Sequence, residues 1–354
     1  MVNGVRGSGG LERVLIHKAS YLAEKYGYTI RVLVLNEELG PTFYPLSPLV
    51  EIVRFQAIGR GVKYLLQYVR GVREELSKFN PDVLAVCDDG LKGVLLPLFL
   101  PRRRSALIYE RHASIQLSSS WWQRLLMRWT APRYDKFVVL TTGGAAEWPR
   151  AHVKVIPNPL PEFTQPSGDV FVSRQPVILC VGSLSHNKGY DLLIDAWAQI
   201  AEQHPGWQIQ VYGKGDPTPF QKHARELGIG DNINFLAPIK DIASKYREAA
   251  FLVLPSRSEG FGMVLIEAMS CGMPCISFDC PSGPGDIINN GIDGVLVPAE
   301  NVNALAQAMS NFINNPSQRE RFGEAARATA KRYDIDKIAA EWNALFSSLL
   351  IQHD

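Results

Sequence analysis

The sequence predicts an α/β protein with two doubly wound, parallel-sheet (Rossmann-like) domains that face a central cleft. Short apolar runs alternate with helical patterns through most of the chain, which is typical of sheets built from strand–helix–strand units. The 354 residues exceed what one ordinary core accommodates, so two domains are expected. The proline-rich stretch "VIPNPLPEFTQPSGDVFVSRQP" (155–176) separates two sets of strands, and we interpret it as the linker because proline fixes φ and removes a backbone donor.

The expected strands define an N-terminal domain over 1–158 and a second domain over 159–334. In the first domain the strands are expected at 30–35, 82–87, 105–109 and 136–141. In the second domain they are expected at 176–181, 207–212, 233–236, 249–254, 275–278 and 294–297. Sheets of this type bind their ligands at the carboxyl ends of the strands.

The first helix is expected from Leu11 to Tyr26, where apolar residues recur on one side. It follows the glycine-rich loop "GVRGSGG" (4–10). A doubly wound domain normally places a buried strand before such a loop, yet only Met1 and Val2 are available for it. Either the natural chain starts upstream of Met1, or the first strand is vestigial.

Composition favours a globular, cytoplasmic protein, with 46% hydrophobic and 20% charged residues. No apolar run approaches the roughly 18 residues of a membrane span, and the polar N-terminus does not read as a signal peptide. The five cysteines form no Cys-x-x-Cys pair, so we expect buried thiols: Cys87, Cys180, Cys271, Cys275 and Cys280. We expect no metal site, and we interpret the pair Asp88 and Asp89 in "CDDG" as a loop or helix cap.

The net charge of +2 is divided unevenly. Residues 1–160 carry 22 Lys and Arg against 13 Asp and Glu, whereas residues 161–354 carry 15 against 22. Within 119–136 the segment "WWQRLLMRW" (121–129) combines tryptophans with arginines. A basic amphipathic helix with tryptophans can lie on an anionic membrane surface, although an ordinary helix packed on its own sheet fits the same pattern. No nucleic-acid motif accompanies the charge.

Two glycine-containing loops follow expected strands of the second domain. In "VGSLSHNKGYDLLIDAW" (181–197) the chain turns through Gly182 and Ser183 and places Lys188 at a helix start. A cation with free N–H groups at a helix N-terminus suits a diphosphate, although a surface lysine after an ordinary loop would look alike. "VYGKGDP" (211–217) repeats the arrangement with Gly213, which taken alone is a weak sign of a site.

The stretch "SRSEGFGMVLIEAMSCG" (256–272) holds two glutamates around a Gly-Phe-Gly loop. Glu259 precedes an expected helix and Glu267 lies within it. A carboxylate near a helix N-terminus is favoured by the helix dipole, so the pattern allows either a capped core helix or a ligand site. For Glu267 the alternative is a solvated helix position, which its largely apolar neighbours disfavour.

These segments, with "CPSGPGDII" (280–288) and "NGIDGVLVP" (290–298), resemble the retaining family 4 glycosyltransferases of the GT-B fold in order and spacing. The resemblance covers nearly the whole chain, because "GSGGLERVLIHKASYLAEKYGY" (7–28) looks like the first loop and helix of that family. "VIPNPL" (155–160) looks like its interdomain crossing. The segment 280–288 is most similar to members that transfer hexoses in bacterial cell-surface polysaccharide or lipopolysaccharide assembly. The resemblance also implies that 335–354 crosses back to pack on the first domain.

The resemblance implies a nucleotide-sugar site with specific residues. Glu267 would accept hydrogen bonds from the ribose, Glu259 would lie beside the donor sugar, and Lys188 would contact the diphosphate. The backbone of Gly260, Phe261 and Gly262 would line the phosphate end.

From the first domain, the resemblance implies that Gly9 and Gly10 approach the leaving group and that His112 reaches the sugar. The family usually has an arginine where this chain has Ser183, and we expect Arg257 or another arginine to compensate.

The predicted function is metal-independent transfer of a hexose, with retention, from a nucleotide sugar to a glycan. The donor is expected to carry UDP and the acceptor to be linked to lipid at the inner face of the cytoplasmic membrane, where the enzyme would be peripheral. A nucleotide-sugar epimerase of the same fold remains an alternative, as does a non-catalytic two-domain binding protein. An epimerase would need no acceptor, and a binding protein gives no reason for the two glutamates.

Overall fold

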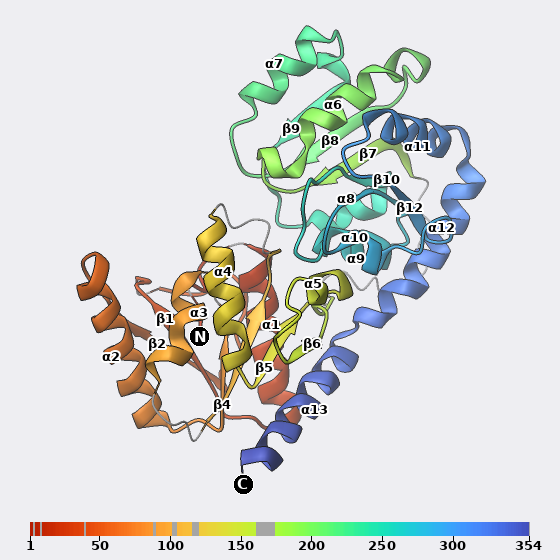
Figure 1. The fold of residues 1–354 in the computed structure, drawn as a ribbon. Coiled ribbons are helices and arrows are strands. Elements are labelled where there is room, and N and C mark those ends of the chain that lie inside the picture. Colours follow the sequence, from red (N-terminus) through yellow and green to blue (C-terminus); the bar gives the residue numbers. More distant parts are fainter. Residues whose placement is uncertain are drawn as a thin grey trace. The chain divides into compact units, whose positions relative to one another are not determined.

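The computed structural model describes residues 1–2, 4–7, 9–38, 40–87, 90–100, 105–114, 120–160 and 174–353. The chain forms two compact units (Figure 1): one comprises Met1–Pro159 with Ile335–Asp354, and the other Leu160–Asp334. We call them the N-terminal and the C-terminal unit. The predicted caps Asp88 and Asp89 lie outside the described residues, as does most of the predicted linker.

The C-terminal unit is built on a six-stranded sheet in which every neighbouring pair is parallel. The strand order is β12-β11-β10-β7-β8-β9. The strands are β7 (Gln175–Val181), β8 (Gln208–Tyr212), β9 (Ile233–Leu236), β10 (Ala249–Leu254), β11 (Cys275–Asp279) and β12 (Gly294–Pro298). All six residues of β10 are buried, as expected for a central strand covered on both faces. The parallel sheet confirms the predicted fold class for this unit.

The helices of the C-terminal unit pack in two groups. One group contains α6 (Tyr190–Ala198), α7 (Thr218–Glu226) and α11 (Val302–Asn314); the other contains α8 (Ile242–Glu248), α9 (Met263–Ser270) and α12 (Pro316–Ala330). A short α10 spans Pro284–Ile287. Two helices begin at polar caps, because the side chain of Asp241 accepts from Ser244 N and that of Asn301 accepts from Ala304 N.

The N-terminal unit contains a four-stranded and a two-stranded sheet, and all their pairs are parallel. The larger sheet has the order β3-β4-β5-β6: β3 (Val83–Val86), β4 (Ala106–Arg111), β5 (Lys136–Val139) and β6 (Val153–Val155). The smaller sheet pairs β1 (Ile30–Leu35) with β2 (Val50–Phe55). The sequence analysis missed β2 and β6, because β2 mixes charged and apolar residues and β6 has only three residues.

The N-terminal unit contains the helices α1 (Gly10–Tyr26), α2 (Gly61–Phe79), α3 (Leu91–Phe99), α4 (Trp121–Thr130), α5 (Thr142–Ala146) and α13 (Ile335–His353). Helix α1 ends at Gly27, whose φ of 69° places it in the left-handed conformation that glycine favours. Helix α13, blue in Figure 1, packs against α1 and shares its core with β4. Trp342 of α13 is 1% exposed. The predicted return of 335–354 to the first domain is therefore confirmed.

Met1 and Val2 occupy the place of a strand between β1 and β3. Val2 forms parallel bridges with both Val34 and Cys87. Its backbone N–H donates to Leu33 O at 3.0 Å, and Cys87 N donates to Met1 O at 2.8 Å. The amino group of Met1 donates to Ala85 O at 2.6 Å. The two residues thus join the two sheets and act as a very short first strand.

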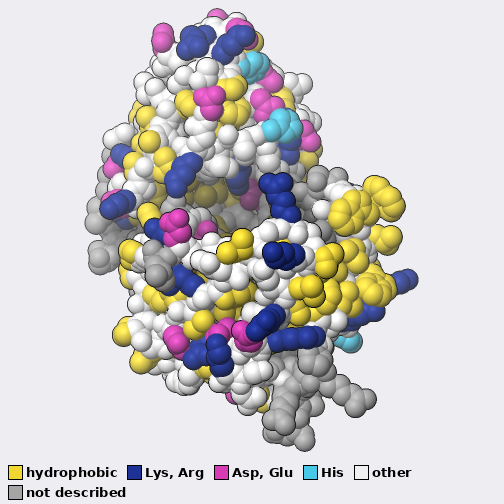
Figure 2. Space-filling model, turned by 90° about the vertical axis from the view of Figure 1, so that its left-hand side faces the viewer, with side chains coloured by type: hydrophobic (Ala, Val, Ile, Leu, Met, Phe, Trp, Pro, Cys, Tyr) yellow, Lys and Arg dark blue, Asp and Glu magenta, His cyan; other side chains and the backbone are white. Residues whose placement is uncertain are grey.

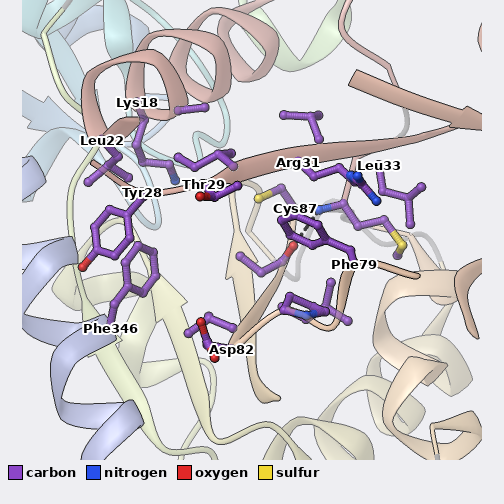
Figure 3. Close-up of a pocket in the computed structure, with 18 of the residues that line it drawn as sticks. Lys18, Leu22, Tyr28, Thr29, Arg31, Leu33, Phe79, Asp82, Cys87 and Phe346 are labelled. Carbon is purple, nitrogen blue, oxygen red and sulfur yellow. Dashed lines mark hydrogen bonds between the residues drawn. The ribbon is translucent and has the colours of Figure 1, made fainter. Parts of the chain in front are cut away.

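A cavity of about 510 Å³ continues from this short strand between β1 and β3. Figure 3 shows it lined by Thr29, Arg31 and Leu33 from the β1 side, Asp82 from the β3 side, and Phe346 of α13. The facing edges of β1 and β3 pair with no other described strand along this length. The cavity therefore lies between the facing edges of two strands and is bordered by residues of α1, α2 and α13.

Candidate functional site

Three loops of the C-terminal unit meet at the carboxyl ends of β7, β8 and β10. Leu184 N donates to Lys214 O at 2.7 Å, and Arg257 N donates to Asn187 O at 2.8 Å. The side-chain amide of Asn187 donates to Ser258 O at 2.8 Å. Since carboxyl ends of parallel strands share one edge of the sheet, the predicted loops at 182–189, 213–215 and 255–262 form one site.

Glycines allow these loops to approach each other closely. A Cβ atom on Gly213 would lie 1.8 Å from the carbonyl oxygen of Gly182. At Gly189, where φ is 66°, a Cβ atom would lie 1.9 Å from the carbonyl oxygen of Pro255. No other residue fits either position. The glycine pattern therefore encodes backbone contact between loops that are far apart in sequence.

Lys188 and Glu259 form an ion pair in this site. Lys188 ends a short 3₁₀ helix (His186–Lys188), just before the N-terminus of α6. Its Nζ donates to Oε1 of Glu259 at 2.6 Å, and the two side chains are 21% and 11% exposed. The structure thus brings together the residues predicted to contact the diphosphate and the donor sugar, and leaves both partly accessible.

Glu267 is a buried carboxylate on α9, only 2% exposed. The alternative of a solvated helix position is therefore wrong. Its Oε2 accepts a hydrogen bond from the hydroxyl of Tyr246 at 2.8 Å. Tyr246 comes from α8 and is fully buried. The sequence analysis did not single out Tyr246, because its partner is 21 residues away on another helix.

Arg257 is held by other protein groups. Its guanidinium makes two hydrogen bonds to the carboxylate of Asp191, at 2.9 and 2.6 Å, and one to Glu300 at 3.1 Å. It also donates to His186 O at 2.6 Å. Burial by itself would raise the pKa of Asp191, but Arg257 holds that pKa below its ordinary value. Protein groups thus accept from four of the five N–H donors of Arg257, and its predicted compensating role stays a prediction.

The loop around Arg257 also contains two buried hydroxyls. Ser256 is fully buried and Ser258 is 8% exposed. Neither Oγ has a hydrogen-bond partner among the described residues. Ser183, where the family has an arginine, is exposed, and its Oγ lies 3.4 Å from Oγ of Ser185. The exposed hydroxyl of Ser183 thus occupies the position of the arginine, and the two buried hydroxyls flank Arg257.

A second cluster lies at the carboxyl end of β4 in the N-terminal unit, where His112 follows the strand. Nε2 of His112 lies 3.2 Å from Oε1 of Glu110. The same oxygen accepts from Nζ of Lys18 on α1, and Oε2 accepts from Sγ of Cys87 at 3.0 Å. Burial alone would raise the pKa of Glu110, but Lys18 and His112 outweigh it and hold the pKa well below its ordinary value. Of this group, the sequence had indicated His112 as a site residue and Cys87 only as a buried thiol.

Among the described residues, Cys87, Glu110 and His112 offer ligand atoms within 4.8 Å of one another, close enough to be tested as a metal site. The ammonium of Lys18 already lies against Glu110, however, and burial raises the pKa of the Cys87 thiol far above its ordinary value. Both features oppose a metal cation, which prefers a thiolate and an unpaired carboxylate. The donor set therefore fits a hydrogen-bonded cluster better than a metal centre.

The other predicted residues of the N-terminal unit lie at helix ends or on its surface. Gly9 caps the N-terminus of α1, and Gly10 is the first residue of that helix. Trp121 of α4 is 76% exposed and Trp129 is 53% exposed, whereas Met127 is buried. The guanidinium of Arg133 lies 3.7 Å from the ring centroid of Trp129. Hydrophobic and basic side chains also lie side by side on the face seen in Figure 2.

The five cysteines are all buried and free, as predicted. The three arginines at 102–104 and the first residue of the segment 119–136 lie outside the described residues. No helix in the described parts of the chain is both long and apolar enough to cross a membrane.

Family models match both units. The model for group 1 glycosyl transferases matches residues 164–329, and the model for glycosyltransferase family 4 matches residues 8–161. The chain belongs to the glycosyltransferases. Its relatives support this assignment over the full length: an uncharacterized glycosyltransferase of Haemophilus influenzae is 26% identical, with 97% of this chain and 98% of the relative covered. The amylovoran biosynthesis glycosyltransferase AmsD of Erwinia amylovora is 28% identical, with 98% of each chain covered.

Solved structures identify the fold of this glycosyltransferase as GT-B. The sucrose-phosphate synthase of Thermosynechococcus elongatus superposes with a TM-score of 0.83 at 22% identity, covering 99% of this chain and 96% of that one. HepE of Anabaena, solved with UDP and glucose, gives a TM-score of 0.80 at 19% identity, with 98% of each chain covered. The predicted fold class and family are thus confirmed, and the relatives place the glycosyltransferase among enzymes of bacterial polysaccharide biosynthesis.

Proposed function

We propose that this glycosyltransferase moves a hexose from a UDP-sugar to a lipid-linked glycan, with retention of anomeric configuration and without a metal ion. The observation that carries the proposal is the Lys188–Glu259 pair at the sheet edge, close in sequence to the buried carboxylate Glu267. A UDP complex of the structurally similar HepE supports the choice of nucleotide.

In the proposed donor complex, the diphosphate binds at Lys188 and the N-terminus of α6. The ammonium, the helix dipole and the backbone N–H groups of the glycine loops together stabilise negative charge. When the diphosphate binds the ammonium of Lys188, the carboxylate of Glu259 loses this ion-pair partner and can accept hydrogen bonds from the sugar hydroxyls. The carboxylate of Glu267 accepts from the ribose hydroxyls while Tyr246 continues to orient it.

The proposed chemistry depends on preorganised positive charge. Departure of UDP develops negative charge on the diphosphate, and Lys188 with the glycine N–H groups stabilises that charge at the transition state. Same-face attack, in which the departing phosphate assists deprotonation of the acceptor hydroxyl, gives retention without a carboxylate nucleophile. In this proposal His112 contacts the sugar, and the N-terminus of α1 at Gly9 and Gly10 approaches the leaving group.

The enzyme is proposed to reach its lipid-linked acceptor by binding an anionic membrane surface through α4. The exposed tryptophans of α4 suit insertion between lipid headgroups, and arginines 124, 128 and 133 suit attraction to anionic lipid. A Campylobacter jejuni relative, 24% identical over 97% of this chain, is named for transfer to an undecaprenol-linked glycan. Peripheral attachment to the inner face of the cytoplasmic membrane follows from this proposal.

The first test is thermal unfolding with UDP, GDP and other nucleoside diphosphates, for the wild type and for Glu267→Ala. A ligand that binds only the folded state raises the midpoint. We expect UDP to raise the midpoint of the wild type and to lose most of that effect in Glu267→Ala. If no nucleotide raises the wild-type midpoint, the proposed donor site is wrong.

The second test identifies the reaction. UDP-sugars are incubated with and without a lipid-linked oligosaccharide, in the presence of EDTA, and the products are examined by NMR. Transfer with an unchanged anomeric configuration supports the proposal, whereas an epimerised UDP-sugar formed without acceptor supports an epimerase. Binding of UDP with no turnover of any sugar supports a binding protein.

The third test concerns the membrane. Co-sedimentation with vesicles containing phosphatidylglycerol should fall when Trp121, Trp122 and Trp129 are replaced together by serine, while UDP binding stays unchanged. The matched control replaces Ile58, Val62 and Leu66, which are also exposed hydrophobic residues of this unit. Equal losses for both triple variants would contradict a specific role for α4.

A further inference from the structure

Three polar side chains of the N-terminal unit, those of Lys18, Cys87 and His112, converge on one buried carboxylate, that of Glu110. We propose that Glu110 is a positioning residue that holds His112 as the tautomer with hydrogen on Nε2, and that Lys18 keeps the carboxylate in place for this task. The inference rests on the proposed function in one respect only, which is that His112 contacts the sugar. It assigns roles to Glu110 and Lys18, which no motif in the sequence indicated.

The tautomer follows from the hydrogen-bond chemistry of Glu110. An ionised carboxylate can only accept hydrogen bonds, and Oε1 lies 3.2 Å from Nε2 of His112. Nε2 must therefore carry the hydrogen, and in the neutral ring Nδ1 becomes the acceptor. A histidine in this state can accept a hydrogen bond from a sugar hydroxyl through Nδ1.

Lys18 supplies the charge that keeps Glu110 ionised in a buried position. Glu110 is 2% exposed and the side chain of Lys18 is 8% exposed, so the pair is shielded from water. An unpaired carboxylate would be costly at this depth. Nζ of Lys18 also lies 4.0 Å from the ring centroid of Trp342, which belongs to the C-terminal helix α13. Helix α13 thus covers the cluster and holds Lys18 against Glu110.

The backbone that carries His112 is also fixed. Arg111 is 4% exposed, and its guanidinium donates to Ala113 O at 2.7 Å and to Ser114 O at 3.2 Å. These bonds close the turn that follows β4. The Arg111 side chain therefore restrains the backbone next to His112, and the Glu110 carboxylate restrains its imidazole ring.

Glu110 could alternatively belong to a metal site with Cys87 and His112. A bound metal would need to displace Lys18 from Glu110 and to deprotonate the Cys87 thiol, which donates to Oε2 at 3.0 Å. In the proposal all of these groups are already satisfied as a hydrogen-bonded cluster. A metal site predicts that zinc shifts the His112 resonances, whereas the hydrogen-bonded cluster predicts that zinc leaves them unchanged.

The test uses the double variant Lys18→Met with Glu110→Met, which replaces the ion pair by apolar side chains of similar size. Such replacements of buried pairs are often close to neutral for stability. The matched control is Arg31→Met with Glu51→Met, which removes another ion pair of the same unit, 2.7 Å between Arg31 Nη2 and Glu51 Oε2. The third variant is His112→Ala.

The first readout is ¹⁵N NMR of the imidazole of His112, which distinguishes the two neutral tautomers. We expect the Nε2–H form in the wild type and in the control, unchanged by EDTA, and a mixture of tautomers in the Lys18/Glu110 variant. A wild-type protein with hydrogen on Nδ1 would overturn the proposal, as would resonances that shift with zinc at micromolar concentration.

The second readout is the release of UDP from a panel of UDP-sugars. We expect the Lys18/Glu110 variant to lose about 10- to 100-fold in kcat, as is usual when a group that orients a site residue is removed. KM for the donor and the UDP-induced rise in midpoint should stay unchanged. If His112→Ala loses activity and the Lys18/Glu110 variant does not, the positioning role is wrong. If the wild type releases no UDP, the proposed function fails, and the NMR result still decides the tautomer.

Discussion

Replacement of Tyr246 by phenylalanine deletes one hydroxyl next to Glu267 and leaves the rest of the side chain in place. Tyr246 is fully buried and Glu267 is 2% exposed, so water cannot replace the lost donor. The bond length is 2.8 Å and its acceptor is a carboxylate. Hydrogen bonds to charged groups contribute about 1.5–3 kcal/mol. For a domain of this size we therefore expect the midpoint of unfolding to fall by about 3–12 °C.

The assay is differential scanning calorimetry of wild type and Tyr246→Phe, with and without UDP. The loss should appear in the transition that UDP raises, because Tyr246 and the proposed donor site belong to the same unit. The matched control is Tyr333→Phe, since the hydroxyl of Tyr333 makes a long hydrogen bond of 3.4 Å to an uncharged acceptor, the backbone carbonyl of Asp286. A loss below about 0.5 kcal/mol, or no larger than that of the control, would refute the assigned role of this bond.

Three further predictions concern the charged pairs and the cavity. Lys188→Met should weaken UDP binding by roughly 10- to 150-fold, the equivalent of a charged hydrogen bond, whereas Glu259→Gln should keep UDP binding and lower transfer by about 10- to 100-fold. Isothermal calorimetry measures the binding and initial rates measure the transfer. Equal effects of the two variants on UDP binding would contradict the assignment. The folded pKa of Glu110 lies below that of an unfolded glutamate, about 4.3. The carboxylate therefore stabilises the fold above that pH, and this contribution is lost as the pH falls further. In urea unfolding from pH 6 to 3, the unfolding free energy of the Lys18/Glu110 double methionine variant should depend less on pH than that of the wild type. Four apolar β-branched residues fused before Met1 should fill the cavity between β1 and β3 and raise the unfolding free energy by about 0.5–2 kcal/mol. If a glycine–serine extension of equal length stabilises as much, burial of apolar side chains in the cavity is excluded as the cause.

The strands of this protein were predictable where apolar runs are continuous. The runs at 30–35, 233–236 and 249–254 begin and end where β1, β9 and β10 do. Strand β2 was missed because Glu51 and Arg54 interrupt its apolar pattern. They are tolerated there because, among the described strands, β2 pairs only with β1. Periodicity reports burial, so a half-buried edge strand gives a weaker signal than a central strand.

The candidate site was predictable where its residues lie in one short segment of the chain. Glu259 in the loop before α9 and Glu267 within α9 have a fixed spacing in the sequence. The partners of these groups were not predictable in the same way. Arg257 or another arginine is expected to compensate for Ser183, and the sequence did not indicate that Arg257 binds Asp191, 66 residues earlier, and Glu300, 43 residues later.

The sequence by itself determined the two parallel α/β domains, the family and the glycine positions at which loops must touch. Tertiary structure alone decided which charges meet: Lys188 with Glu259 across 71 residues, and Lys18 with Glu110 across 92. The physical reason is that periodicity and turn chemistry act over a few residues along the chain. The pairing of distant side chains depends on strand register and on which helices cover the sheet, and the folded protein sets both of these.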